Sequence, residues 1–138
     1  YVGDVDSVNA SALMSLIDAG AVPVIAPLSF DSGCGLLNTN ADTIATSVAT
    51  AFAPVASEVI LTFCFEKKGV LSDPEDENSV IREITPEIYD NLKKDGTVSG
   101  GMIPKLDNAF ASLELGVSKV VITNAAELGR GTGTEVHL

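Results

Sequence analysis

Short runs of β-branched residues alternate along this chain with longer segments whose apolar residues recur at helical spacing. The runs VPVIA (22–26), SEVILTF (57–63) and KVVITN (119–124) are typical of buried strands. Strands that alternate with helices predict a layered α/β fold with a mainly parallel sheet. In such sheets, ligands bind beyond the carboxyl ends of the strands.

Four helices are expected around these strands. Their starts are predicted at capping residues or prolines: Asp6 or Ser7, Asn40 or Asp42, Thr85, and Pro104. Their ends are predicted at Gly20, Pro54, Gly96 and Gly116. Neither a repeat nor a linker interrupts the pattern, which indicates a single domain over 1–138.

Composition excludes several classes of protein. The net charge is −11, whereas a nucleic-acid-binding domain normally carries a basic face. The longest apolar run, AGAVPVIAPL, is short and contains two prolines, so neither a membrane span nor a signal peptide is expected. Cys34 and Cys64 stand apart and His137 is the one histidine, which argues against a metal site. We therefore predict that both cysteines are buried free thiols in a reducing cytoplasm.

Lys105 lies in the stretch SGGMIPK (99–105), in the first turn of the last predicted helix. A cation there is repelled by the helix dipole, by about 0.3–1 kcal/mol. A polyphosphate held by the glycine backbone and the helix start would attract the lysine more strongly than the helix dipole repels it. The alternative is a solvated lysine that follows an ordinary glycine turn.

The stretch NTNAD (38–42) places two amides and a carboxylate at the start of another predicted helix. Capping chemistry explains it in part, since Asn40 would accept from free N–H groups and Asp42 would complement the dipole. The functional alternative is that Asn38 and Asn40 donate to a ligand while Asp42 holds a lysine in place.

Taken together, GDVDSVN (3–9), PVIAPL (23–28), NTNADT (38–43), GVL (69–71) and SGGMIPK (99–105) resemble, in the same order, the acetylglutamate kinases of the amino-acid kinase family. The resemblance implies a three-layer α/β/α sandwich around an eight-stranded, mostly parallel sheet, in a homodimeric cytoplasmic enzyme. It implies ATP-dependent phosphorylation of the side-chain carboxylate of N-acetyl-L-glutamate in arginine biosynthesis, with Mg²⁺ carried by the nucleotide. It further implies that these residues are the carboxyl-terminal, nucleotide-binding part, which would be inactive without the amino-terminal part.

The resemblance also assigns roles to individual positions. Lys105 would steady the phosphates, Asp42 would organise the catalytic lysines, and Asn38 and Asn40 would contact the acylglutamate. The residues expected at the nucleotide are Phe63, Lys68, Gly69, Val70, Leu71, Thr97, Val98 and Ser99.

One loop departs from the family pattern. The family reads approximately LTDVPGVL, whereas this chain reads LTFCFEKKGVL, three residues longer and with Phe63 in place of an aspartate. Glu66 could replace that aspartate and Lys67 or Lys68 could reach a phosphate, or EKK could be a solvated loop. The tail also departs, because the family's extra helix before the last strand is missing.

Three alternatives remain open at this point. The acceptor could be another acylglutamate such as N-succinylglutamate, or another amino acid, as in glutamate 5-kinase. The pairing of NxNAD with GGMIxK disfavours glutamate 5-kinase. A non-catalytic nucleotide- or metabolite-binding module is the third possibility.

Overall fold

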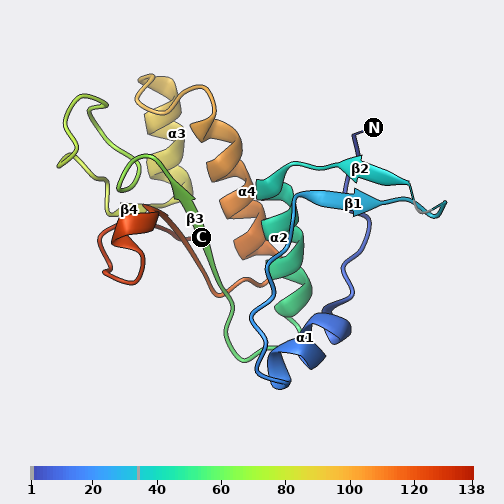
Figure 1. Ribbon diagram of the computed structural model, residues 1–138. Helices are drawn as coiled ribbons and strands as arrows, with labels where there is room; N and C mark the ends of the chain where they lie inside the picture. Colours follow the sequence, from blue (N-terminus) through green and yellow to red (C-terminus); the bar gives the residue numbers. More distant parts are fainter. Residues whose placement is uncertain (1, 34) are drawn as a thin grey trace.

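The computed structural model of the chain describes residues 2–33 and 35–138. Its elements in chain order are α1 (Ala10–Asp18), β1 (Leu28–Phe30), β2 (Leu36–Asn38), α2 (Ala41–Phe52), β3 (Ile60–Phe65), β4 (Glu83–Ile84), α3 (Pro86–Lys94), α4 (Met102–Glu114), β5 (Lys119–Asn124), the 3₁₀ helix η1 (Ala125–Glu127) and β6 (Thr134–Val136) (Figure 1).

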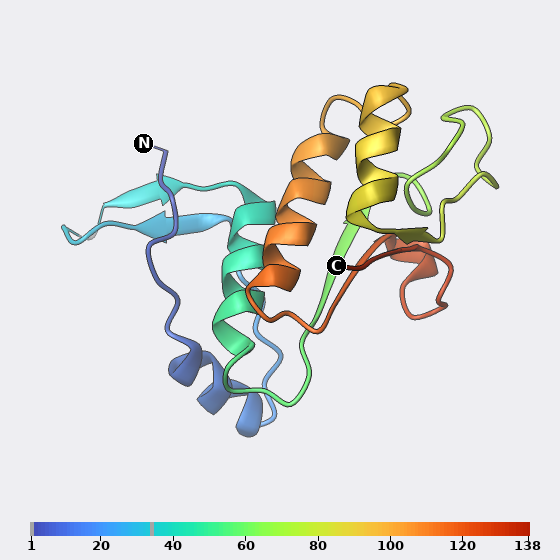
Figure 2. The same ribbon diagram turned by 180° about the vertical axis from the view of Figure 1, so that it is seen from behind.

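A four-stranded sheet in the order β3-β5-β6-β4 forms the centre of the molecule. β3 pairs with β5 and β4 pairs with β6 in parallel, while β5 and β6 are antiparallel. Helices α2, α3 and α4 lie side by side over one face of this sheet (Figure 2). The predicted mixed α/β fold with a mainly parallel sheet is confirmed.

The core lies between the three helices and the sheet. Alternate residues of the strands point into it, because successive side chains of a strand lie on opposite faces. Leu61 and Phe63 of β3 and Val120 and Ile122 of β5 are buried there, against Leu106 of α4. The opposite face of β3 is open, and Ile60 is 52% exposed. This is the face on which the expected three-layer sandwich would carry its second helical layer.

Cys64 lies on that open face and is exposed. The prediction that it is a buried thiol is wrong, because burial follows the two-residue period of β3 and Cys64 falls out of phase with Leu61 and Phe63. Cys34 lies outside the described residues.

Two helix starts are as predicted from their capping residues. Thr85 accepts from the amide of Ile88, with Pro86 at the first helical position of α3. Asn40 accepts from the amide of Thr43 at the start of α2. Both bonds join residues three apart, so the local sequence suffices to specify them.

The other two helix starts differ from the predictions. α1 begins at Ala10 and is capped by Asn9, whose side chain accepts from the amide of Ala12, and not by Asp6 or Ser7. α4 begins at Met102, which makes Pro104 its third residue. Pro104 is tolerated there because a first-turn N–H has no partner in the helix.

The predicted strand 22–26 is absent, and this prediction is wrong. Val22 and Val24 are 86% and 96% exposed, and the segment belongs to no strand of the described chain. A strand exists only when another strand pairs with it, and none of the described residues lies in that position. The position of β3 also differs from the prediction: the strand begins at Ile60, whereas the predicted strand began at Ser57.

The tail holds only the short η1 before β6. The final strand expected at the glycine-rich end of the chain is β6, which enters the sheet between β5 and β4.

Candidate active site

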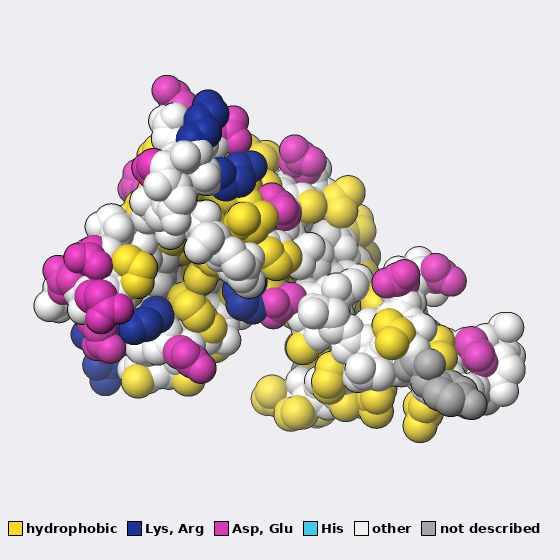
Figure 3. Space-filling model, turned by 90° about the horizontal axis from the view of Figure 1, so that it is seen from above, with side chains coloured by type: hydrophobic (Ala, Val, Ile, Leu, Met, Phe, Trp, Pro, Cys, Tyr) yellow, Lys and Arg dark blue, Asp and Glu magenta, His cyan; other side chains and the backbone are white. Residues whose placement is uncertain are grey.

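The first turns of α2 and α4 meet near the carboxyl end of β3, beside the loops that follow β3 and α3 (Figure 1). This is the end of the sheet at which α/β folds bind ligands. Figure 3 shows the molecule from above, with separate basic side chains, groups of acidic ones and much hydrophobic surface. A ligand phosphate would therefore depend on individual cations and on the backbone, and not on a broad basic patch.

Lys105 and Asp42 form an ion pair across the two helix starts. The distance from Lys105 Nζ to Asp42 Oδ2 is 2.5 Å, and the two side chains are 22% and 30% exposed. Lys105 Nζ also lies 5.7 Å from the centroid of the Phe63 ring. The carboxylate is favoured at the start of α2 and offsets the repulsion that the lysine experiences at the start of α4. A carboxylate and an aromatic face thus hold the ammonium group at this end of the sheet.

The backbone at the start of α4 is open to a ligand. No side chain caps the helix, and its N-cap residue is Gly101. A Cβ atom at Gly100 or Gly101 would meet nothing within 4 Å, and Gly100 has a φ of +55°. Free space over two glycines at an uncapped helix start suits the close approach of an anionic group.

A hollow of about 140 Å³ lies beside this helix start. The residues that line it come from the end of β3 and the loop after it, the loop after α3 and the first turn of α4: Phe65, Lys67, Gly69, Val70, Leu71, Pro74, Thr97, Val98, Ser99 and Met102. Six of the eight residues expected at the nucleotide therefore lie around one hollow. The other two, Phe63 and Lys68, are not among its lining residues.

Phe63 is 4% exposed and belongs to the core beneath Lys105. Phe65, two residues later and so on the same face of β3, lines the hollow. The two-residue period that starts at Leu61 is the signal that could have identified Phe65 from the sequence. Of the two lysines that the sequence offered for a phosphate in the lengthened loop, Lys67 lines the hollow and Lys68 is not among its lining residues.

The loop after β3 is held against β6 by a close contact at Gly69. A Cβ atom there would lie 2.7 Å from Thr134 Oγ1 and 2.7 Å from a methyl group of Val80. The amide of the next residue, Val70, donates to Thr134 Oγ1 at 2.8 Å, and this hydroxyl donates to the carbonyl of Ile81 at 2.6 Å. Gly69 is therefore required by the packing of this loop.

The loop after α3 is ordered by its own polar contacts. Asp95 accepts from the amide of Thr97 at 2.9 Å, and this hydrogen bond holds the pKa of the Asp95 carboxyl below its usual range. The amide of Val98 donates to the carbonyl of Leu92, and Val98 is buried. These contacts hold the backbone of residues 97–99 at the edge of the hollow.

Asn38 and Asn40 lie on either side of the buried Thr39 and are exposed. Asn38 ends the hairpin β1–β2, and its backbone carbonyl accepts from the amide of Gly3. The carboxamide oxygen of Asn40 is engaged in capping α2. The capping interpretation of Asn40 is therefore correct, and its contact with an acceptor stays a prediction.

The described ranges contain no group of three His, Cys, Asp or Glu side chains that could hold a metal ion. Within the same residues, every helix is too short or too polar to cross a bilayer.

Comparison with known proteins identifies the fold and the family. The model of the amino acid kinase family matches residues 1–124. The chain is 52% identical over 136 residues to the acetylglutamate kinase of Phocaeicola vulgatus, covering 99% of this chain and 52% of that enzyme. The acetylglutamate kinase of Methanopyrus kandleri is 43% identical over 137 residues, covering 99% of this chain and 54% of that enzyme.

Among solved structures, smu.665 from Streptococcus mutans UA159 superimposes with a TM-score of 0.79 at 31% identity, covering 99% of this chain and 51% of that one. N-acetylglutamate synthase from Neisseria gonorrhoeae, complexed with coenzyme A and N-acetyl-glutamate, superimposes with a TM-score of 0.83 at 24% identity. The match covers 100% of this chain and 32% of that one, and at this identity it supports the fold alone.

The chain spans about half the length of the curated relatives it matches. The family match nevertheless extends from the first residue through β5, and so includes α2, α4, the ion pair and the hollow. This chain belongs to the amino acid kinase family.

Proposed function

We propose that this chain carries the nucleotide-binding part of a kinase that phosphorylates the side-chain carboxylate of N-acetyl-L-glutamate, a step of arginine biosynthesis. The names of its relatives, at 42–52% identity, support the substrate. The observation that carries the proposal is the Lys105–Asp42 ion pair beside the glycine-lined start of α4.

The residues present fit an ATP molecule at the hollow. Phe65, Leu71 and Val98 line this hollow and would provide apolar contact for a base, while the glycines and Lys105 at the start of α4 would face the phosphates. Six of the predicted nucleotide residues lie around this space: Gly69, Val70, Leu71, Thr97, Val98 and Ser99. A Mg²⁺ ion would be carried by the nucleotide and would take its ligands mainly from ATP and water.

The reaction joins an acceptor carboxylate oxygen to the γ-phosphorus and breaks the bond between that phosphorus and the oxygen of the β-phosphate. The products are an acyl phosphate and ADP. Phosphoryl transfer depends mainly on positioning and on neutralising charge, and little covalent chemistry is required of the protein. Lys105 would donate to phosphate oxygens as charge moves to the leaving oxygen, and Asp42 would keep its ammonium group oriented.

Asn38 and Asn40 would donate amide N–H groups to the acylglutamate. The oxygen of Asn40 already accepts from Thr43, which leaves its NH₂ group to face a ligand. Most of the acceptor pocket, and a further phosphate-binding lysine, would come from the half of the relatives that lies beyond the match. We expect the complete enzyme to be a homodimer and, because it consumes ATP, to work in the cytoplasm.

An ADP-release assay of the complete enzyme with a panel of acceptors tests the proposal. We expect N-acetyl-L-glutamate to be phosphorylated and unmodified glutamate to be inert. A preference for N-succinyl-L-glutamate would correct the acyl group but retain the reaction. ATP binding without phosphorylation of any acceptor would instead identify a nucleotide-binding module.

A further inference from the structure

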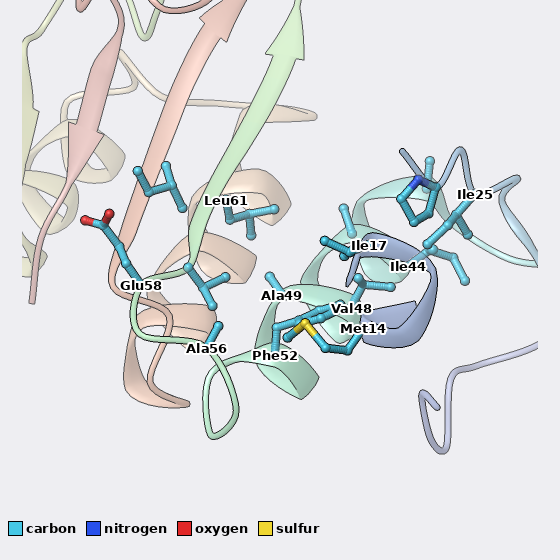
Figure 4. Close-up of a pocket in the computed structure, with 15 residues that line it drawn as sticks. Met14, Ile17, Ile25, Ile44, Val48, Ala49, Phe52, Ala56, Glu58 and Leu61 are labelled. Carbon is cyan, nitrogen blue, oxygen red and sulfur yellow. The ribbon is translucent and has the colours of Figure 1, made fainter. Parts of the chain in front are cut away.

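Two hollows of the molecule differ in the charge of their walls. The hollow beside α4 measures about 140 Å³, and Lys67 is the one charged residue among those described that line it. The second hollow is an apolar groove of about 590 Å³ over α2, whose described lining has Glu58 as its one charged residue (Figure 4). An anionic group would therefore meet a cation in the first hollow and a carboxylate in the second.

The chain is held in place on both sides of Lys67. Two residues before it, Phe65 ends β3 in register with Asn124 of β5. Two residues after it, Gly69 packs against β6, where a Cβ atom would lie 2.7 Å from Thr134 Oγ1. Phe65, Lys67 and Gly69 all line the same hollow. Contacts with two strands of the sheet therefore position the backbone that carries the lysine.

Lys67 is a half-buried cation without a carboxylate partner among the described residues. Carboxylates are close in the sequence, because four acidic residues lie within 73–77 and Pro74 of that segment lines the same hollow. Two of them, Asp73 and Asp76, accept hydrogen bonds from amides of their own loop. Because buried charges are normally paired, a cation of this kind is available to an anionic ligand.

The size of the hollow decides which part of a nucleotide could lie in it. Pockets for drug-sized ligands typically measure about 300–1,000 Å³, so a space of about 140 Å³ would hold only part of a nucleoside triphosphate. Met102, the first residue of α4, borders the hollow, and the open backbone of Gly100 and Gly101 precedes it. Lys105 does not line the hollow. The phosphates nearest the base would therefore meet Lys67, and the terminal phosphate would meet Lys105.

We infer that Lys67 binds the α- and β-phosphates, which remain on ADP after the transfer, and so sets the affinity for the nucleotide. An ammonium group on a flexible stem has three donors and binds phosphate as a point charge. Phe63 stands where the family carries an aspartate, so in this chain the loop offers the hollow a cation in place of a carboxylate. The inference rests on the proposed function, because it takes the hollow to be the nucleotide site.

Replacing Lys67 with Met in the complete enzyme tests this contact. The dissociation constants of ATP and ADP, measured by calorimetry, should each rise at least about 10-fold, as expected for a lost hydrogen bond to a charged group. Adenosine, which has no phosphate, should bind equally to the variant and the wild type. KM for ATP should rise by a similar factor while kcat stays within about twofold, because a contact equally strong in ground state and transition state affects binding alone.

Three further variants separate this contact from the general effect of charge. Lys68→Met removes the same charge from the next residue, which does not line the hollow, and should weaken ATP binding at least about threefold less because its effect is screened. Lys67→Arg keeps the charge and should restore part of the affinity. Lys94→Met, at the exposed end of α3, should leave ATP binding unchanged. Equal Tm values for the ligand-free proteins would report that all of them are folded.

Several outcomes would overturn the inference. Lys67→Met could leave the affinity for ATP unchanged, Lys68→Met could weaken it as much, or adenosine could lose affinity as ATP does. A lower kcat at unchanged KM would instead assign Lys67 to the transferred phosphate. The binding measurements need no acceptor, so they are independent of the proposed reaction. A wild-type enzyme that binds no nucleotide would refute the proposed function as well, whereas equal ATP binding with and without Lys67 would refute this inference alone.

Discussion

At the scale of single residues, the candidate site consists of two opposite charges at two helix starts. Asp42 is at a position that its own helix dipole favours, whereas Lys105 is at a position that its helix dipole disfavours. The ion pair between them offsets the unfavourable position of the lysine. We therefore expect Lys105 to contribute little to stability, so that its proposed role in catalysis can be tested separately from folding.

Replacing Lys105 with Met in the complete enzyme should affect kcat far more than stability. The loss of the ion pair and the relief from the dipole are each worth up to about 1 kcal/mol and nearly cancel. Losing a donor aimed at developing charge typically reduces kcat by about 10²–10³. Steady-state kinetics and a thermal melt measure both effects.

Lys94→Met is the matched control, since Lys94 is exposed at the end of α3 and is not among the residues that line the hollow. Its kcat should equal that of the wild type. A Lys105→Met enzyme with kcat within about threefold of wild type would contradict a role in phosphoryl transfer.

Two substitutions of Asn40 separate its cap from its proposed contact with the acceptor. Asn40→Ala should reduce the free energy of unfolding by about 1 kcal/mol, because the bond to the Thr43 amide is lost. Asn40→Ser keeps a capping oxygen but removes the amide donor. In the complete enzyme, Asn40→Ser should therefore raise KM for the acylglutamate at nearly unchanged Tm. An unaltered acceptor KM in both variants would restrict Asn40 to capping.

At the scale of elements, Tyr89 joins α3 to α4. Its hydroxyl donates to Asp107 Oδ1 at 2.7 Å, and its ring stacks on Phe110 with centroids 5.4 Å apart. Burial, and then the Asp107 carboxylate, raise the pKa of Tyr89 well above its ordinary value of 10. The unfolded chain then releases this proton at a lower pH than the folded chain does.

This shift predicts alkaline destabilisation that depends on one side chain. The contribution of Tyr89 to stability is complete below its unfolded pKa of about 10 and is lost as the pH rises toward its higher folded value. Tyr89→Phe should lower the free energy of unfolding at pH 7, because the hydrogen bond to Asp107 is lost. The same variant should lose less stability than the wild type between about pH 9 and 11.

Urea unfolding of both proteins at several pH values checks this prediction. Lysines titrate in the same range, so the difference between the two proteins is the quantity to measure. Parallel curves for the two proteins would show that Tyr89 ionises equally in the folded and the unfolded chain.

At the scale of the whole molecule, the chain exposes apolar surface beside a free strand edge. Val22 and Val24 are exposed in the segment that follows α1, and Ile60 is exposed at the start of β3. An exposed edge next to apolar surface invites association between chains.

The 138 residues by themselves are therefore expected not to phosphorylate N-acetyl-L-glutamate. Half of the length of the relatives, and with it most of the proposed acceptor pocket, lies beyond the match. An ADP-release assay with the full-length Phocaeicola vulgatus enzyme as the positive control checks this. Measurable turnover by the isolated chain would overturn the proposal that acceptor binding needs the second half.

Local signals in the sequence determined where several elements begin and end. The caps at Thr85 and Asn40 involve hydrogen bonds between residues three apart, so short stretches of sequence specify them. Gly96 and Gly116 follow α3 and α4 with φ values of +81° and +95°, a conformation that glycine adopts without strain. The motifs around Asn38 and Lys105 also predicted the family correctly.

Only the tertiary structure decided the features that depend on residues far apart in the chain. The segment 22–26 has the residues of a buried strand, but pairing needs a neighbour that the described residues do not provide. The exposure of Cys64 depends on which face of β3 the helices cover. The ion pair at the candidate site joins residues 63 positions apart, so its geometry follows from the packing of α2 beside α4. Helices and caps form through local hydrogen bonds, whereas strands and sites require contacts that the folded chain alone creates.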